Sequence, residues 1–409
     1  MAKSYFTSSD VIAAVKRKIT FPTSQDTFTD TDILAFANDE LMVSQVPSIL
    51  EYHEEYFVTK LLEGGSTSTP LVASRSRYPI PGRAIGLRLR NIFYEDTGGN
   101  LFELSRISPD EQAFFQADLG TSVGVNRFYL EGNDVILVPT IGSSPSGNII
   151  MSYYLRPNQL VENDRAAILT GFSKTITIDY ASVVAGDTVT IDDEVFTAVA
   201  AAPSTDEFVI GASGSDTASN LANAIVTNGV ASASATSAVI TVTYTDRTIE
   251  FETDNEDGFD IQATINCVCT SVPSHLVAAI NVDVLQTKPG HRTLALSIPI
   301  LASSATSLTF TDALVPQTLL VGDYICQEEE CIIPQIPTDL QNNLIERTCA
   351  RILAAIGDYN GVQEMNSKIA DAEKRQGSLI DNRTEGNPQK ILARGSPLRY
   401  GKFHIFRRW

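Results

Sequence analysis

The clearest helical pattern in the chain is found in residues 337–361, PTDLQNNLIERTCARILAAIGDYNG. Thr338 and Gln341 stand at the spacing of a helix-capping pair, in which the hydroxyl accepts the third helical N–H and the amide reaches back. Apolar residues then recur at the spacing of one helix face: Leu340, Leu344, Ile345, Ile352, Leu353 and Ile356. Gly357 interrupts this pattern, and Val362, Met365 and Ile369 begin a second one. We expect two amphipathic helices here.

The end of the chain is basic and aromatic. Beyond Glu385 there is no acidic residue, and residues 390–409 interleave six basic side chains with eight large apolar or aromatic ones. The alternative is a disordered, solubilising end, but such ends are poor in aromatic residues. We therefore predict a docking arm at 381–409 that is too small to fold alone. Its expected contact residues are Arg394, Arg399, Tyr400, Lys402, Phe403, Phe406, Arg407, Arg408 and Trp409.

Three shorter helices are expected at the N-terminus. One runs from Ser8 to Ile19, and Thr29 with Asp32 three residues later marks the start of the next. Pro47 opens a third, for which Ile49, Leu50, Phe57, Leu61 and Leu62 are the expected buried positions. Residues 1–64 and 337–380 should together form one helical bundle.

The pattern changes to strands after Gly64-Gly65. Residues 87–94 alternate between apolar and polar, and Gly98-Gly99-Asn100 turns the chain back. Similar strands are expected at 127–130, 135–138, 148–155, 280–285, 293–298 and 307–310. Residues 65–172 and 269–336 are therefore expected to form a central antiparallel β-domain.

Residues 173–268 differ in composition from their neighbours. They are rich in Ala, Ser, Thr and Asp, and residues 174–266 hold fifteen acidic residues against only Lys174 and Arg247, a net charge of −13. Short alternating strands and one helix, at 217–226, are expected within them. We predict an inserted, acidic α+β module. The expected fold class is thus α+β: a helical bundle from N- and C-terminal helices, a central antiparallel β-domain with this insert, and an extended C-terminal arm.

The overall composition excludes some classes of protein. The chain has 409 residues, ordinary apolar content and a net charge of −19, with no apolar run long enough to span a bilayer, so a membrane partner is not expected. Five cysteines, an odd number, indicate free thiols in a reducing compartment.

No catalytic pattern is present. His53, His275, His291 and His404 share no local spacing, and there is no phosphate-binding or dinucleotide-binding glycine motif. The spacing of Cys267, Cys269, Cys326 and Cys331 does not match the usual zinc sites, so buried thiols are favoured. Four acidic residues around Gly258 could hold Ca²⁺, but a solvated turn is favoured: Asp254, Glu256, Asp257 and Asp260. No enzyme activity, metal or cofactor is expected.

A basic stretch lies between residues 75 and 90. It holds Arg75, Arg77, Arg83, Arg88 and Arg90 and no acidic residue. These arginines could line a channel for DNA phosphates or face an acidic partner surface. Because Arg88 and Arg90 alternate with Leu87 and Leu89, the face could equally be a solvated strand surface.

The order of these parts resembles the head-to-tail connector, or portal adaptor, proteins of tailed bacteriophages. The resemblance rests on the N-terminal helices, the β-domain, residues 321–337, the following helix at 340–358 and the basic tail. It implies a structural virion protein of the neck, assembled in the host cytoplasm, that forms a ring of twelve copies. It also implies a portal protein and a tail or nozzle protein as partners, docking of the C-terminal segment on the portal, and passage of viral DNA through the ring during packaging and ejection.

Two other functions remain open. The β-rich middle and the insert would also suit a tail-tube or receptor-facing virion component. The arginine face and the tail would suit a nucleic-acid-binding module outside the phage context.

Overall fold

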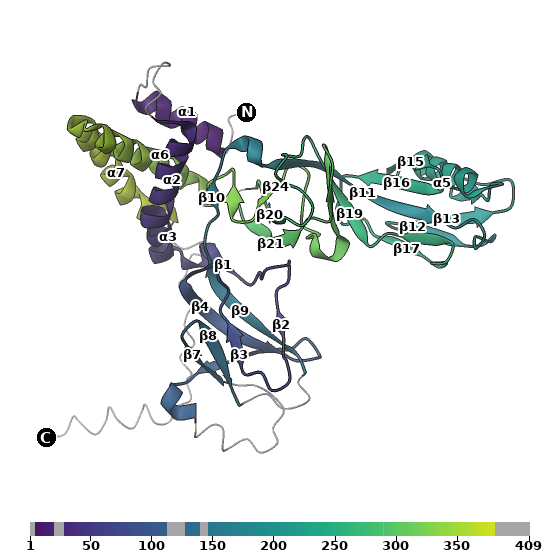
Figure 1. Cartoon of the computed structure of the whole chain (residues 1–409), viewed down its shortest axis with the longest axis horizontal. Helices are drawn as coiled ribbons and strands as arrows, with labels where there is room; N and C mark the ends of the chain where they lie inside the picture. Colours follow the sequence, from purple (N-terminus) through teal and green to yellow (C-terminus); the bar gives the residue numbers. More distant parts are fainter. Residues whose placement is uncertain (1–4, 20–27, 113–126, 140–145, 289, 381–409) are drawn as a thin grey trace.

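The computed structural model describes residues 5–19, 28–112, 127–139, 146–288 and 290–380. Its elements form three lobes around one junction (Figure 1). A helical lobe lies at the upper left of the view, a first β lobe lies below it, and a long β arm extends to the right. Among the described residues, 35% lie in strands and 29% in helices.

The helical lobe is organised around the helix expected at residue 338. Gly357 ends this helix with a left-handed backbone conformation at φ +86°, which glycine adopts without strain. The helical elements of the lobe are α1 (Ser8–Ile19), α2 (Asp30–Glu40), η1 (Leu41–Gln45), α3 (Val46–Tyr52), η2 (Glu54–Phe57), α6 (Thr338–Ile356) and α7 (Tyr359–Ile380). Helices α1, α2 and α7 all pack against α6.

Of the two capping pairs expected at the starts of α2 and α6, only the first is present. Thr29 caps α2, since its hydroxyl accepts the Asp32 N–H at 3.2 Å and the Asp32 carboxylate accepts the Thr29 N–H at 2.8 Å. The expected capping pair of α6 is absent, because Pro337 is the cap residue and makes no side-chain cap bond. Gln341 instead accepts the backbone N–H of Phe6 at 2.7 Å. The third helix is also shorter than expected, and Leu61 and Leu62 lie outside it.

The predicted fold class is wrong. The chain is mostly β, with several sheets, and its helices do not form a bundle of N- and C-terminal helices. The apolar cluster under α6 includes strand residues such as Tyr154, Leu285 and Tyr324 beside Leu344 and Ile352. The helices therefore bury their apolar faces against strands as well as against each other. Helical periodicity in a sequence shows that a face is buried, but not which element covers it.

The first β lobe consists of two sheets with apolar side chains between them. The five-stranded sheet contains β1 (Val58–Thr59), β2 (Thr69–Pro70), β4 (Ala84–Glu95), β5 (Leu101–Glu103) and β9 (Asn148–Leu155). The four-stranded sheet contains β3 (Arg77–Pro79), β6 (Ser105–Arg106), β7 (Arg127–Glu131) and β8 (Asp134–Val138). Tyr78, Leu137, Met151 and Tyr153 belong to the shared core.

The β arm is built on one long strand, β11 (Ala167–Ile178). It belongs to a ten-stranded sheet with β15 (Ser232–Thr236), β16 (Val239–Tyr244), β18 (Phe259–Ile261), β19 (Thr264–Cys269), β20 (Asn281–Leu285), β21 (Thr293–Pro299), β22 (Ala302–Ser303), β23 (Ser307–Thr311) and β24 (Tyr324–Gln327). At the far end lie α5 (Gly214–Asn228) and a second sheet of β12 (Thr188–Ile191), β13 (Glu194–Val199), β14 (Glu207–Val209) and β17 (Phe251–Thr253).

Two strands cross the expected borders of the insert. β11 runs through residue 173, and β19 runs through residue 268 and pairs with β23. One apolar cluster contains Phe172 and Leu308 together with Phe196 and Leu221 of the distal part. The division of the chain into domains stays a prediction, but these strands tie residues 173–268 to the rest of the arm.

Candidate functional site

The expected docking residues of the C-terminal arm lie outside the described residues. This applies to Arg394, Arg399, Tyr400, Lys402, Phe403, Phe406, Arg407, Arg408 and Trp409. The expected arginine face, in contrast, lies within the described residues.

The five arginines of the expected basic face lie in different environments. Arg77 on β3 pairs with Glu131 at 2.6 Å and Asp134 at 2.9 Å. Arg75 lies with its guanidinium 4.9 Å from the centre of the Tyr78 ring and donates to the Arg77 carbonyl. These contacts hold the two arginines against the sheet of β3 and β8.

Two further arginines lie on β4 of the five-stranded sheet and contact its neighbour β9 and the helical turn η2. Arg88 lies 5.0 Å from the centre of the Tyr154 ring, and Arg90 pairs with Glu55 at 3.2 Å and Glu54 at 3.7 Å. Glu54 also accepts the Tyr154 hydroxyl at 2.9 Å. Burial and this neighbouring carboxylate raise the pKa of Tyr154.

Arg83 lies in the interior, at the point where the lobes meet. The residue is 5% exposed, and its guanidinium donates to both oxygens of Asp283, at 3.0 and 2.7 Å. Asp283 lies on β20 and is fully buried. A buried carboxylate is costly unless it is paired and hydrogen-bonded, and Asp283 also accepts the N–H groups of Ser297 and Glu329.

Two amides extend this contact to the helical lobe. Asn158 donates to Asp283 at 2.7 Å, and its carbonyl side-chain oxygen accepts from Arg83. The Asn158 N–H in turn donates to the side chain of Gln335 at 2.6 Å, two residues before the cap of α6. We call Arg83, Asn158, Asp283 and Gln335 the junction network. It connects the first β lobe, the β arm and the segment that leads into α6.

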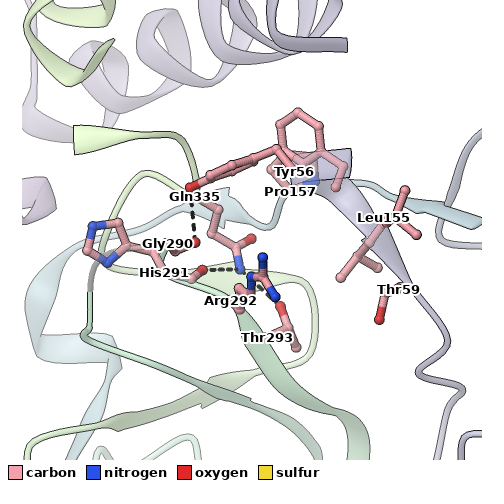
Figure 2. Close-up of a pocket in the computed structure, with 11 residues that line it drawn as sticks. Tyr56, Thr59, Leu155, Pro157, Gly290, His291, Arg292, Thr293 and Gln335 are labelled. Atoms are coloured by element: carbon pink, nitrogen blue, oxygen red, sulfur yellow. Dashed lines mark hydrogen bonds between the residues drawn. The ribbon is translucent and has the colours of Figure 1, made fainter. Parts of the chain in front are cut away.

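A small hollow is lined in part by Gln335 of this network (Figure 2). It has a volume of about 180 Å³ and is lined by Tyr56, Gly290, His291 and Gln335, among others. The Tyr56 hydroxyl donates to the Gly290 carbonyl at 2.9 Å, and Gln335 donates to the His291 carbonyl and to Thr293. The hollow thus lies between η2 of the helical lobe and the β20–β21 connection.

The ring of His291 points away from the hollow and is enclosed by other residues (Figure 2). It is fully buried and packs edge-on against Tyr5, with 5.4 Å between ring centres. Neither ring nitrogen makes a hydrogen bond of normal geometry within the described residues. Burial lowers the pKa of His291 to about 4, although the backbone of Gln286 and Thr287 nearby favours the charged form slightly. The imidazole is therefore neutral near pH 7.

The five cysteines are free and buried. Burial raises the pKa of each thiol, to about 11 for Cys349 and to about 12 for Cys269, so the reactive thiolate is disfavoured. Within the described parts of the chain, no group of three or more His, Cys, Asp or Glu side chains is placed to hold a metal ion.

The two cations of the acidic segment at 174–266 pair with a carboxylate outside that segment. Lys174 and Arg247 both pair with Asp312, each at 2.5 Å, and Asp312 belongs to η5 (Asp312–Leu314) after β23. None of the fifteen acidic side chains of this segment forms an ion pair with a described residue. The net charge of −13 on this segment is therefore not neutralised by ion pairs of its own carboxylates.

No local pattern in the sequence predicts the junction network. Asp283 was visible only as one charged residue inside the apolar strand Asn281–Leu285, which is an unusual position for an unpaired carboxylate. Its partner Arg83 is 200 residues away in the chain, and Asn158 and Gln335 carry no motif of their own.

Comparison with known proteins gives one family. No curated protein matches the chain, and no described helix is long and apolar enough to cross a membrane. The family model of the SU10 adaptor protein matches residues 6–206, from α1 to the segment after β13. This part of the chain, just under half of it, is therefore similar to a phage adaptor, and the match supports a structural protein of the phage head-to-tail adaptor type.

Proposed function

We propose that this protein forms a ring that joins the portal vertex of a phage head to the tail and continues the DNA channel. The observation that carries the proposal is the match to the SU10 adaptor protein over residues 6–206. The matched part contains Arg83 and Asn158, which fix the lobes to one another through Asp283. A subunit with lobes held in this way suits a structural ring, in which each copy must keep one shape.

The ring would contain twelve copies and sit in the virion neck after assembly in the host cytoplasm. Its partners would be the portal protein on one side and a tail or nozzle protein on the other. Viral DNA would pass through it only transiently. No catalytic role is part of this proposal.

The C-terminal residues 381–409 would provide the attachment to the portal. Phe403, Phe406 and Trp409 would be the apolar anchors, and the neighbouring arginines would meet carboxylates of the portal. The acidic part of the β arm would face away from the DNA, because fifteen unpaired carboxylates repel phosphates.

The contacts of the five arginines favour binding of a protein partner over binding of DNA. Arg77, Arg83 and Arg90 already pair with carboxylates of this chain, so binding phosphate would require breaking those pairs. Arg75 and Arg88 pack on aromatic rings and remain the residues of this set most able to reach a partner.

Truncation after Lys390 tests the attachment. The truncated protein should keep the circular dichroism spectrum and melting temperature of the full chain but lose binding to the cognate portal protein. Trp409→Ala should weaken binding by roughly thirtyfold, the usual effect of losing an interface anchor worth about 2 kcal/mol. Tyr180→Ala, which removes an exposed aromatic residue of the β arm, is the matched control and should bind normally. Near-normal binding by the truncated protein would exclude the C-terminal residues as the attachment.

A further inference from the structure

The hollow beside Gln335 has walls from all three lobes (Figure 2). The helical turn η2, strand β9 of the first β lobe and strand β21 of the arm each place a side chain on it: Tyr56, Leu155 and Thr293. Small ligands bind preferentially in such hollows at the borders between structural units, where apolar walls carry a few polar groups. Its position therefore makes this hollow a candidate binding site.

The hydrogen-bond acceptors that Figure 2 shows in the hollow are already used. The Gly290 carbonyl accepts the Tyr56 hydroxyl at 2.9 Å, and the His291 carbonyl accepts Gln335 at 3.3 Å. Gln335 donates its other amide hydrogen to Thr293 at 3.0 Å, and its oxygen accepts the Asn158 N–H at 2.6 Å. The Gln335 side chain is thus fully engaged within the protein, and a ligand that needs acceptors would gain little here.

The polar groups that remain are donors. The Thr293 hydroxyl accepts from Gln335, and the Thr59 hydroxyl accepts the Leu61 N–H at 3.1 Å. Neither hydroxyl donates to a residue that the structure describes, so each still has a hydrogen to offer. Arg292 adds a guanidinium, and it is exposed, so a ligand can reach it from solvent.

The hollow has positive charge and no carboxylate. Arg292 is the one permanently charged residue among those that line it, and it forms no ion pair within the described part of the chain. Glu54 and Glu55 precede Tyr56 on η2, but they pair with Arg90 and do not line the hollow. Charge and donors together favour an anion.

The size and the walls narrow the class of anion. The volume is about 180 Å³, and a dry cavity of about 150 Å³ is enough to hold benzene. The rest of the lining is largely apolar, with Phe57, Val58, Leu155 and Pro157. A carboxylate matches the planar fork of a guanidinium, and an apolar body attached to it would fill the remaining space. Inorganic phosphate has no such body and would leave the apolar wall uncovered.

We propose that this hollow binds a carboxylate that carries an apolar body of about the size of one side chain. A free small acid and the C-terminal residue of another protein present this same chemistry. Either ligand would contact η2, β9 and β21 at once and would fasten the three lobes to one another. The inference goes beyond the ring function and does not depend on the portal.

Saturation-transfer NMR of the full-length protein with benzoate tests the proposal. The expected Kd is about 1 mM, an ordinary value for a ligand of so few atoms. Benzamide, which has nearly the same shape but no charge, should bind at least about tenfold more weakly, as should inorganic phosphate. Equal binding of benzamide would show that Arg292 does not select the ligand, and equal binding of phosphate would show that the apolar wall does not. Either result would overturn the proposal.

Two variants locate the binding of benzoate. Arg292→Gln removes the charge from an exposed position and should weaken binding about tenfold or more. Val58→Phe keeps the charge but fills the hollow, and it should weaken binding to a similar extent. The matched control is Arg106→Gln on β6, which removes an exposed arginine that does not line the hollow and should bind benzoate normally. Circular dichroism and melting temperature confirm that each variant is folded, and normal binding by folded Arg292→Gln would overturn the proposal.

A dipeptide separates the two sources of the carboxylate. If the natural ligand is a protein C-terminus, acetyl-Ala-Phe with a free carboxylate should bind more tightly than benzoate, and its C-terminal amide should not bind. If the ligand is a free small acid, benzoate should bind more tightly than the dipeptide. Absence of binding by both acids would overturn the proposal. Portal binding is measured separately, so failure here leaves the proposed function intact.

Discussion

At the scale of single residues, Arg83 and Arg77 show how different two arginines of one short stretch can be. Both were expected on the same basic face, but Arg83 neutralises a carboxylate with no exposed surface, whereas Arg77 makes ion pairs with its side chain 54% exposed. Burial, which local sequence does not reveal, decides which of them matters for stability.

Arg83→Gln should therefore destabilise the protein by about 3 kcal/mol, since it leaves the Asp283 charge without a cation. The remaining donors to Asp283 keep the loss at the low end of the range for broken buried pairs. Arg77→Gln should cost less than about 1 kcal/mol. Urea unfolding at pH 7 measures both, and equal losses would show that the junction network does not hold the lobes.

His291 should make stability depend on pH. Its pKa is lowered to about 4, so between pH 6.5 and 4 the unfolded chain takes up a proton that the folded chain refuses. The free energy of unfolding should fall across this window, by up to about 3 kcal/mol, and this contribution should become constant below pH 4. Phe keeps a ring against Tyr5 and cannot titrate. The stability of the normal chain minus that of His291→Phe should thus decrease as pH falls from 6.5 to 4, and a constant difference would contradict the assignment.

At the scale of elements, β11 decides how the β arm can be shortened. Removal of residues 173–268 cuts β11 and deletes β19, which pairs with β23, so this protein should aggregate. Removal of 180–257 with a tight Gly-containing turn keeps the pairing of Ile178 with Phe259, where Asp179 already donates to the Gly258 carbonyl at 3.0 Å. That protein should remain soluble but less stable, because β16 is lost. Size-exclusion chromatography and thermal melting compare the two, and equal solubility would show that the arm folds in independent parts.

Local signals in the sequence predicted elements better than partners. The start of α2 at Thr29 and the end of α6 at Gly357 follow from capping chemistry within a few residues, and both are confirmed. The start of α6 was misread because Gln341 bonds to Phe6, 335 residues away. The fold class failed for the same reason, since strands far along the chain complete the core under the helices. The expected docking residues lie beyond the described part of the chain.

At the scale of the whole molecule, charge should prevent self-association without a template. The net charge of −19 repels neighbouring copies, and most of it comes from the distal arm. Native mass spectrometry should show a monomer or small oligomer alone and twelve copies after addition of the cognate portal. A complete ring without portal at low salt would show that no template is needed, and absence of any portal complex would end the adaptor proposal.

The junction network also sets how the molecule responds to force. Donors from Arg83, Asn158 and the backbone of Ser297 and Glu329 converge on the two oxygens of one carboxylate, Asp283. Pulling the first β lobe away from the β arm must therefore disturb all of these hydrogen bonds together, because they share one carboxylate. Under force, the contact between these lobes should therefore stay rigid at small loads and then open in one cooperative step rather than bend gradually.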